Sequence, residues 1–301
     1  MNKTSVGLLL LVMLVSAACA QENLGARPMG MGGAFVGLSD DVNAIFINPA
    51  GISAIRRESV LVSTRVQQGR EYTLIGGVEN TPFGTLGVGY VGSTDPIASD
   101  LSTAAWDSDS AVKYTTQTLY LTAARELNQA MRVPENLGVL SIGMNVKFSS
   151  RKIGVSTGLS RDGGSNVDID LATIFKPTRD LSLGLSLQNL FNNDNSLIAG
   201  LSTIEQKNST VLAGVSGRLF DDKLTWAVEG EEIGCEWAPV KGLALRAGRG
   251  KDCTTTGLGI SLGGFGIDYA YLNKTSPIHY WSVSIITLEN QPTKVAALAS
   301  E

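Results

Sequence analysis

The chain has 301 residues and a formal net charge of −4, a balance that excludes a nucleic-acid binder, which needs a basic face. Hydrophobic residues make up 43% of the chain, which excludes disorder, and three cysteines are too few for a disulfide scaffold. Charged residues make up only 17% and glycine contributes 34 residues, a composition typical of an all-β protein or of one whose exterior need not face water.

The first twenty residues predict an export signal. Lys3 is followed by an apolar run over residues 6–15 and by Ala18-Cys19-Ala20, the small-x-small pattern of a signal-peptidase site. Ten apolar residues are too few for a membrane-spanning helix, which needs about twenty. Cleavage would leave a mature chain beginning at Gln21. Acylation of Cys19, as in a lipoprotein, is the alternative, and either reading places the protein outside the cytoplasm.

Residues 21–57 form a separate N-terminal segment without strand alternation. Ser-Asp-Asp at 39–41 predicts the cap of a short helix over residues 42–46. Asn48-Pro49 predicts its end, because the residue before a proline is pushed out of the α region. The apolar residues at 45–47 argue against free exposure of this segment, so a disordered leader is the less favoured reading.

Residues 58–288 alternate apolar with polar or small side chains, which predicts strand after strand. The alternation and the turn residues predict fourteen strands, at about 58–67, 71–80, 84–93, 110–127, 137–153, 166–177, 180–191, 207–220, 223–231, 232–239, 243–250, 254–263, 265–272 and 277–288. Tight turns alternate with longer polar loops at 94–110, 154–166, 192–206, 249–254 and 273–277, the layout of an outer-membrane barrel. Residues 289–301 look like a C-terminal tail.

A soluble β-sandwich or propeller would also alternate. Three features favour a transmembrane antiparallel β-barrel instead. Gly and Ser dominate the non-apolar face, no repeat of about forty residues is present, and Tyr and Trp gather near strand ends, as in the aromatic girdles of membrane barrels.

The sequence GARPMGMGGAFVGLSDDVNAIFINPAGIS, at 25–53, resembles the N-terminus of PorV/PorQ and FadL-like outer-membrane proteins. The stretches at 167–190, 242–248 (GLALRAG) and 264–271 (GFGIDYAY) are also similar to PorV-like proteins. The resemblance implies a fourteen-stranded barrel whose N-terminal segment folds inside as a plug. A barrel of that size has a lumen too wide for its own side chains to fill. The residues of the plug motif are Gly30, Gly32, Gly33, Asp40, Asp41, Asn48, Pro49 and Gly51.

The same resemblance implies two functions. A PorV/PorQ-like protein would sit among the lipids of the outer membrane and assist secretion or surface delivery of proteins, with a translocon and a cargo protein as partners. A FadL-like protein would instead take up small hydrophobic molecules. The predicted loops are short for a FadL-type fatty-acid channel, which favours the PorV/PorQ-like group.

Charged residues on the polar faces of the strands are expected to point into the lumen, because a basic residue facing lipid near the midplane costs about 2–4 kcal/mol. These lumen charges are Lys147, Asp168, Asp170, Arg246 and Asp268. They are expected to pair with one another and with the plug, particularly at Arg27 or Asp40.

Catalytic and metal-binding patterns are missing from the sequence, so we expect no enzyme, metal or cofactor. His279 is the only histidine and begins the last strand, which favours a residue at the barrel rim over a catalyst. Cys235 and Cys253 remain after signal removal. Export to an oxidising compartment allows a disulfide between them, and two intervening turns leave the bond undecided.

Overall fold

The structure is a computed structural model that describes residues 24–67, 70–97, 112–128, 138–155, 160–191 and 209–287. The predicted export signal at 1–20, the predicted loop at 192–206 and the predicted tail at 289–301 lie outside these residues. None of the helices within the described ranges is long and apolar enough to cross a membrane.

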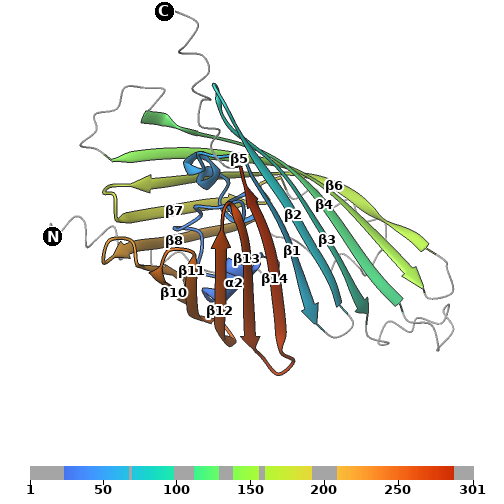
Figure 1. The fold of residues 1–301 in the computed structure, drawn as a ribbon. Coiled ribbons are helices and arrows are strands. Elements are labelled where there is room, and N and C mark those ends of the chain that lie inside the picture. The colour runs from blue at the N-terminus through green and yellow to red at the C-terminus, as the bar shows by residue number, and fades with distance from the viewer. Residues whose placement is uncertain are drawn as a thin grey trace, which may run out of the picture.

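Fourteen antiparallel strands form a closed barrel in which β1 pairs with β14 (Figure 1). This confirms the predicted fold class and strand number. The strands are β1 (Ser59–Gln67), β2 (Arg70–Thr81), β3 (Gly84–Ile97), β4 (Val112–Glu126), β5 (Val139–Val155), β6 (Ser160–Lys176), β7 (Leu181–Gln188), β8 (Thr210–Leu219), β9 (Leu224–Glu229), β10 (Glu232–Val240), β11 (Leu243–Gly250), β12 (Cys253–Leu262), β13 (Phe265–Asn273) and β14 (Ile278–Ile286).

The predicted loop lengths were partly wrong. The loop expected at 154–166 is mostly strand, because β6 begins at Ser160 and its first residues pair in register with the end of β5. The loop expected at 249–254 is a tight hairpin between Gly250 and Cys253. Both errors have one cause: the predictions took stretches of polar residues as loops, whereas backbone pairing between neighbouring strands continues through them.

Outward-facing side chains of the strands are mostly apolar, whereas the inward-facing ones include polar and small residues together with apolar ones such as Leu74 that pack against the plug. On β5, Leu140, Ile142 and Met144 are exposed, whereas the alternating Asn145 and Lys147 are buried. This orientation is the reverse of a soluble barrel and suits a wall whose outer surface meets lipid.

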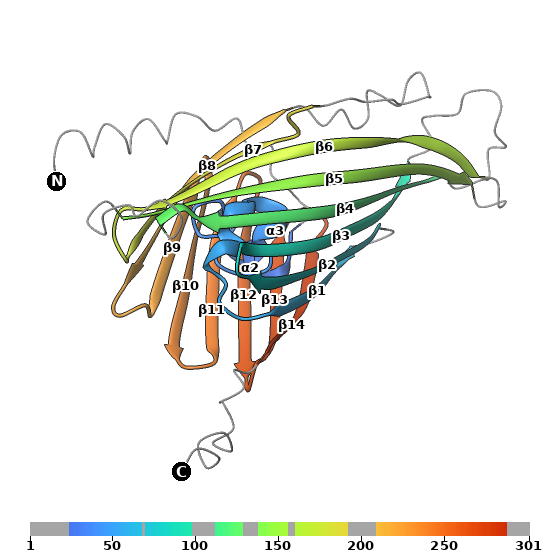
Figure 2. The same ribbon diagram turned by 90° about the horizontal axis from the view of Figure 1, so that it is seen from above.

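Three short helices lie inside the barrel. These are α2 (Ala26–Gly30), α3 (Ala44–Ile47) and the 3₁₀ helix η1 (Pro49–Ala54), and Figure 2 shows α2 and α3 enclosed by the strands. Residues 24–54 are called the plug below. Nearly all of the plug is buried, so the expectation that its apolar residues avoid exposure is met.

The predicted helix is shifted. It covers Ala44–Ile47 rather than 42–46, its N-cap residue is Asn43, and no side chain caps it. Asp41 instead closes the preceding turn, where Oδ1 accepts from the backbone N of Asn43 at 2.8 Å. The α-helix ends at Asn48 as predicted, but Pro49 begins η1 because proline is pre-set for the first position of a helix.

The closing seam between β1 and β14 touches the plug. Ala26 N donates to Ser282 Oγ on β14 at 2.8 Å, and Ser282 Oγ donates to Ser63 Oγ on β1 at 2.8 Å. One buried hydroxyl therefore joins the start of the plug to the first and last strands.

Candidate functional site

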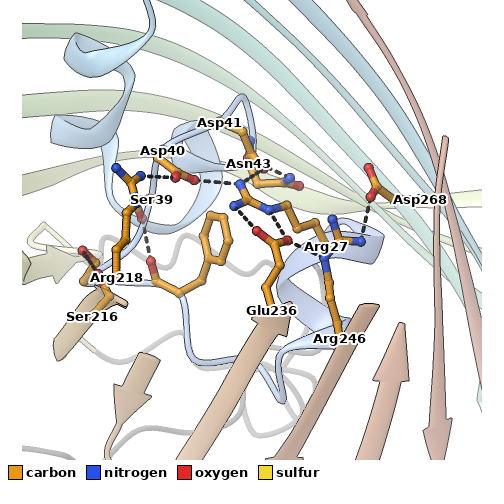
Figure 3. A network of polar contacts seen from close by, with 12 residues as sticks. Arg27, Ser39, Asp40, Asp41, Asn43, Ser216, Arg218, Glu236, Arg246 and Asp268 are labelled. Atoms are coloured by element: carbon orange, nitrogen blue, oxygen red, sulfur yellow. Dashed lines mark hydrogen bonds and ion pairs between the residues drawn. The ribbon is translucent and has the colours of Figure 1, made fainter. Parts of the chain in front are cut away.

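Arg27 of α2 holds the polar side of the plug (Figure 3). Its Nη1 donates to Asp40 Oδ1 at 2.6 Å and to Asp41 Oδ2 at 2.8 Å. Its Nε and Nη2 donate to the two carboxylate oxygens of Glu236 on β10, each at 2.9 Å. A guanidinium that grips both oxygens of a carboxylate is a strong and directional contact, so Arg27 ties the plug to the wall.

The same network spreads across the inner wall. Arg246 on β11 donates from Nε to Glu236 Oε2 at 2.6 Å and from Nη1 to Asp268 Oδ1 on β13 at 2.6 Å. Arg218 on β8 donates to Asp40 Oδ2 at 2.9 Å. Three arginines thus face four carboxylates, and every member is bound to a group of opposite charge. We call these seven groups the anchor network.

Burial and opposite charge act against each other within the plug. Burial lowers the pKa of Arg27, but the carboxylates of Asp40, Glu236 and Asp41 outweigh it and hold that pKa well above its ordinary value. Burial also raises the pKa of Asp41, and the positive charge of Arg27 opposes that rise. The anchor therefore keeps its cation under all ordinary conditions.

Asn48 of the plug motif joins three parts of the molecule. Its Nδ2 donates to the carbonyl of Val36 at 3.0 Å and to the carbonyl of Thr173 on β6 at 3.2 Å. Its Oδ1 accepts from the backbone N of Ala50 at 3.2 Å, which starts η1 beside Pro49. The buried amide thus supports the fold of the plug and its contact with the wall.

The glycines of the plug motif serve conformation and close approach. Gly32 and Gly33 have φ of +73° and +95°, which an L side chain rarely adopts. A methyl group on Gly51 would lie 2.0 Å from the carbonyl oxygen of Ser39. Within the motif, the buried members are Gly30, Gly32, Asn48, Pro49 and Gly51, and the half-buried ones are Gly33, Asp40 and Asp41.

Glycines of the wall let the plug backbone lie directly against the strands. A methyl group on Gly143 of β5 would lie 2.3 Å from Ala50 N, and one on Gly184 of β7 would lie 2.1 Å from the oxygen of Val36. Since real Cβ atoms do not come so close, these positions require glycine. The small inner-face residues noted in the sequence are therefore contact points for the plug.

Glu229 of β9 binds the middle of the plug. Its Oε2 accepts from the backbone N of Phe35 at 3.0 Å and from that of Val36 at 2.9 Å. Sequence reasoning missed Glu229 and Glu236, which stand at the polar positions of short alternating strands. The alternation of Ile233, Cys235 and Trp237 around Glu236 was the available signal.

The opposite side of the plug is apolar. Ile45 and Phe46 of α3 pack against Gly76 of β2 and Gly89 of β3, and a methyl group on Gly89 would lie 2.6 Å from Phe46 Cε1. Tyr120 of β4 meets the Phe46 ring edge-on, with centroids 5.2 Å apart. Side chains, rather than backbone, fill the space between plug and wall here.

The predicted lumen charges all lie on the inner face, but in two groups. Arg246 and Asp268 belong to the anchor network. The other group is on β5 and β6, where Lys147 Nζ donates to Asp170 Oδ1 and Asn189 Oδ1, each at 2.5 Å. Asp168 Oδ1 accepts from its neighbour's backbone N at 2.8 Å and from that of Phe191 at 3.1 Å. The lumen charges were also expected to pair with Arg27 or Asp40. The structure instead gives these two plug residues other wall partners, Glu236 and Arg218, which the prediction did not name.

A pocket of about 410 Å³ lies beside the anchor network at the end of the barrel where β1 begins and β14 ends. Its walls include Asp40, Asp41 and Asp268, apolar residues such as Leu61, and Arg56 after the plug. The pocket is the open space that adjoins the plug at this end.

The disulfide left open by the sequence is not formed. Cys235 and Cys253 are both free. Cys235 is exposed on the outer face of β10 with Ile233 and Trp237, whereas the half-buried Cys253 shares the inner face of β12 with Thr255. The two thiols thus point to opposite sides of the wall and cannot bond without a change of register.

His279 lies on the outer face near the start of β14. Its Nδ1 shares a hydrogen bond with the hydroxyl of Tyr269 at 2.8 Å. Tyr271 and Trp281 lie on the same face, so His279 belongs to an aromatic cluster of the outer wall. Within the described ranges, no three His, Cys, Asp or Glu side chains are placed to hold a metal ion.

The fold resembles those of a solved toluene transporter and of solved hydrocarbon channels. The toluene transporter TbuX of Ralstonia pickettii is 11% identical, with a TM-score of 0.55 over 88% of this chain and 97% of TbuX. The monoaromatic hydrocarbon channel CymD is 11% identical, with a TM-score of 0.55 over 89% of this chain and 98% of CymD. A mutant of the monoaromatic hydrocarbon channel TodX is 12% identical, with a TM-score of 0.54 over 89% and 98% of the two chains.

No protein-family model matches the sequence, and neither does any curated protein. At identities of 11–12% the structural likeness concerns the fold alone. The resemblance to PorV/PorQ proteins accordingly stays a prediction from the residues.

Proposed function

We propose that the chain is an outer-membrane channel of the FadL-like kind, which passes small hydrophobic molecules through a barrel closed at rest by its plug. In this proposal residues 1–20 direct export, 21–57 form the plug segment, 58–288 form the barrel and 289–301 are a tail. The function is non-enzymatic. The shared fold supports the transport reading, because a toluene transporter and two monoaromatic hydrocarbon channels match this chain over 97–98% of their own length.

The observation that carries the proposal is the unequal contact between plug and wall. Along β5 and β7 the backbones of plug and wall touch at Gly143 and Gly184, so a molecule could pass only if backbone moved. Along β2 and β3 the plug meets the wall through the side chains of Val42, Ile45 and Phe46. Side chains change rotamer far more readily than backbone moves, which makes this the path of least resistance for an apolar molecule.

The outer surface of the same strands is hollowed. A groove of about 780 Å³ runs over β1, β2 and β3, with Val60, Ile75 and Val88 among its apolar walls. Gly76 and Gly89 belong to the wall between this groove and the plug. Apolar surface therefore lies on both sides of the barrel wall at one place.

The test is uptake of radiolabelled toluene by proteoliposomes that contain the full chain. Phe46→Ala should raise the initial uptake rate several-fold, because it opens the apolar side of the plug. Phe35→Ala is the matched control, since Phe35 is an equally buried plug aromatic that lies on the anchored side, where Arg27 stacks over its ring at 5.4 Å. Equal uptake by the two variants, or none by any form, would contradict the proposal.

A PorV/PorQ-like role in protein secretion is the second candidate. It is favoured by the closure of the barrel: all fourteen neighbouring pairs of described strands are hydrogen-bonded, and apolar residues of the plug form one buried cluster with residues of the wall. Such a barrel could serve as a platform for a translocon and its cargo without conducting anything. Deleting the gene would then leave surface proteins in the periplasm while toluene uptake stayed unchanged, the reverse of the result expected for a channel.

A further inference from the structure

The barrel wall has very unequal heights. β9 has 6 residues, whereas β5 and β6 have 17 each, and Figure 2 shows the long strands reaching far past the short ones. At a rise of about 3.4 Å per residue, β9 measures about 20 Å along its axis. With a strand tilt of about 40°, that length covers about 15 Å of the membrane normal, against an apolar band of about 25 Å in outer-membrane barrels.

Charged turns fix the apolar height of this part of the wall. We call β9 the short sector. Its turn at one end carries the exposed Asp221 and Asp222, and its hairpin at the other end carries the exposed Glu231. Charges enter hydrocarbon only at a high cost, so the sector cannot slide along the membrane normal to gain contact with lipid.

The outward side chains between these turns are apolar and few. β9 presents three such positions, at Leu224, Trp226 and Val228. β5 presents five, from Leu140 to Phe148, before its outward residues turn polar. Seen around the barrel, the apolar band narrows from β5 to the short sector.

We propose that the short sector thins the outer membrane locally, and that compressed phospholipid covers its apolar face. A hydrophobic surface shorter than the surrounding hydrocarbon is accommodated by thinning of the bilayer. The inference rests on membrane placement of the barrel and is independent of what the barrel transports. A second copy of the chain that hides the sector is the competing outcome.

The first test lengthens the sector by one pleat without disturbing the plug. Val-Thr inserted after Glu229 and Thr-Val inserted before Glu232 add about 7 Å to the hairpin and keep each original side chain on its face. Thermal unfolding is followed in phosphatidylcholine bilayers with monounsaturated chains from 14 to 22 carbons. We expect the wild type to be most stable in short-chain lipid and the variant to have its optimum at a longer chain.

The matched control inserts the same residues after Ser150 in β5 and before Ser165 in β6. These two residues are register partners and lie beyond the apolar stretch of their strands, so the optimum should stay where the wild type has it. If the lipid chain length of greatest stability does not change on the β9–β10 insertion, or changes equally in the control, the proposal is wrong.

The second test uses Cys235, which is exposed on the outer face of β10. In the Cys253→Ser variant, a nitroxide at Cys235 should report contact with lipid at both high and low protein-to-lipid ratios. Efficient Cys235–Cys235 cross-linking in dilute vesicles would instead show that a second copy covers the sector. That result would contradict the proposal that the short sector thins the membrane, even if uptake of hydrophobic molecules were established.

Discussion

At the residue scale, the anchor network depends on Arg27. Arg27→Ala removes the cation shared by three carboxylates, and loss of one partner from a largely buried ion pair costs about 3 kcal/mol or more. We expect the free energy of unfolding in detergent micelles to fall by about that amount, measured by urea titration with tryptophan fluorescence.

Arg179→Ala is the matched control for this prediction. Its ion pair with Asp222 has a similar N–O distance of 3.0 Å, but the two side chains are 82% and 41% exposed. Exposed pairs contribute little, so the change should stay within about 0.5 kcal/mol. Equal losses in the two variants would mean that the anchor network does not hold the plug.

Gly143 offers a second test at this scale. Gly143→Ala would place a methyl group 2.3 Å from Ala50 N, so the plug must move or the barrel must distort. We expect raised ion conductance in planar bilayers together with a lower unfolding temperature. Gly77→Ala, at a position whose nearest neighbour is 3.8 Å away, should leave both unchanged. Normal conductance of Gly143→Ala would place the plug further from β5.

Period-two alternation was enough to place Lys147, Asp170 and Arg246 on the inner face. It could not name their partners, because alternation fixes the face of a residue and says nothing about which strand lies across the lumen. Arg27 meets Glu236 across 209 positions of sequence, and no local pattern encodes that distance.

At the element scale, the plug is expected to close the barrel. Deleting residues 24–54 removes the plug groups that bind Glu229 and Glu236 but leaves the strand ladder intact. The barrel should therefore still form, with lower stability and with permeability to small polar solutes, measured as liposome swelling in sugars of graded size.

A folded barrel that stays impermeable after this deletion would mean that the plug is not the closure. Circular dichroism at the same time separates that result from failure to fold. The Arg27→Ala variant should show a smaller permeability than the deletion, because it loosens the plug without removing it.

Strand positions were predictable where apolar residues recur, as along β5 and β13. The ends of the strands were harder to predict. β6 starts at Ser160, six residues before the predicted 166, because its polar first residues continue the pairing with β5. The start of α3 was missed since Asp41 closes a turn rather than capping the helix. In both cases polar groups found partners that the local sequence does not show.

At the scale of the whole molecule, closure of the strand ladder predicts resistance to detergent and protease. Unheated protein in dodecyl sulfate should migrate faster than boiled protein. Protease treatment of membranes should leave a core that begins near residue 24 rather than 58, because the plug is buried in the lumen. Cleavage of the plug before the strands, or recovery of the protein in the soluble periplasmic fraction, would contradict this architecture.

The overall architecture was predictable from the sequence. The function was not, because the sequence left both protein secretion and uptake of small hydrophobic molecules open. Alternating strands and the segment at 25–53 indicated a plugged barrel, which the structure bears out as a closed fourteen-stranded fold. The transport proposal requires movement of Ile45 and Phe46, the secretion proposal requires a docking partner, and strand periodicity encodes neither.

The hydrogen bonds among Ala26, Ser282 and Ser63 bear on the order of folding. The contact from Ala26 to Ser282 spans 256 positions, so it forms only after nearly the whole chain has been delivered. Since contacts between distant residues are slow to form, sealing of the β1–β14 seam should be a late step of assembly. The plug should therefore stay incompletely bound while the sheet is still open. Pairing of β14 with β1 then closes the barrel and supplies the hydroxyl that binds Ala26.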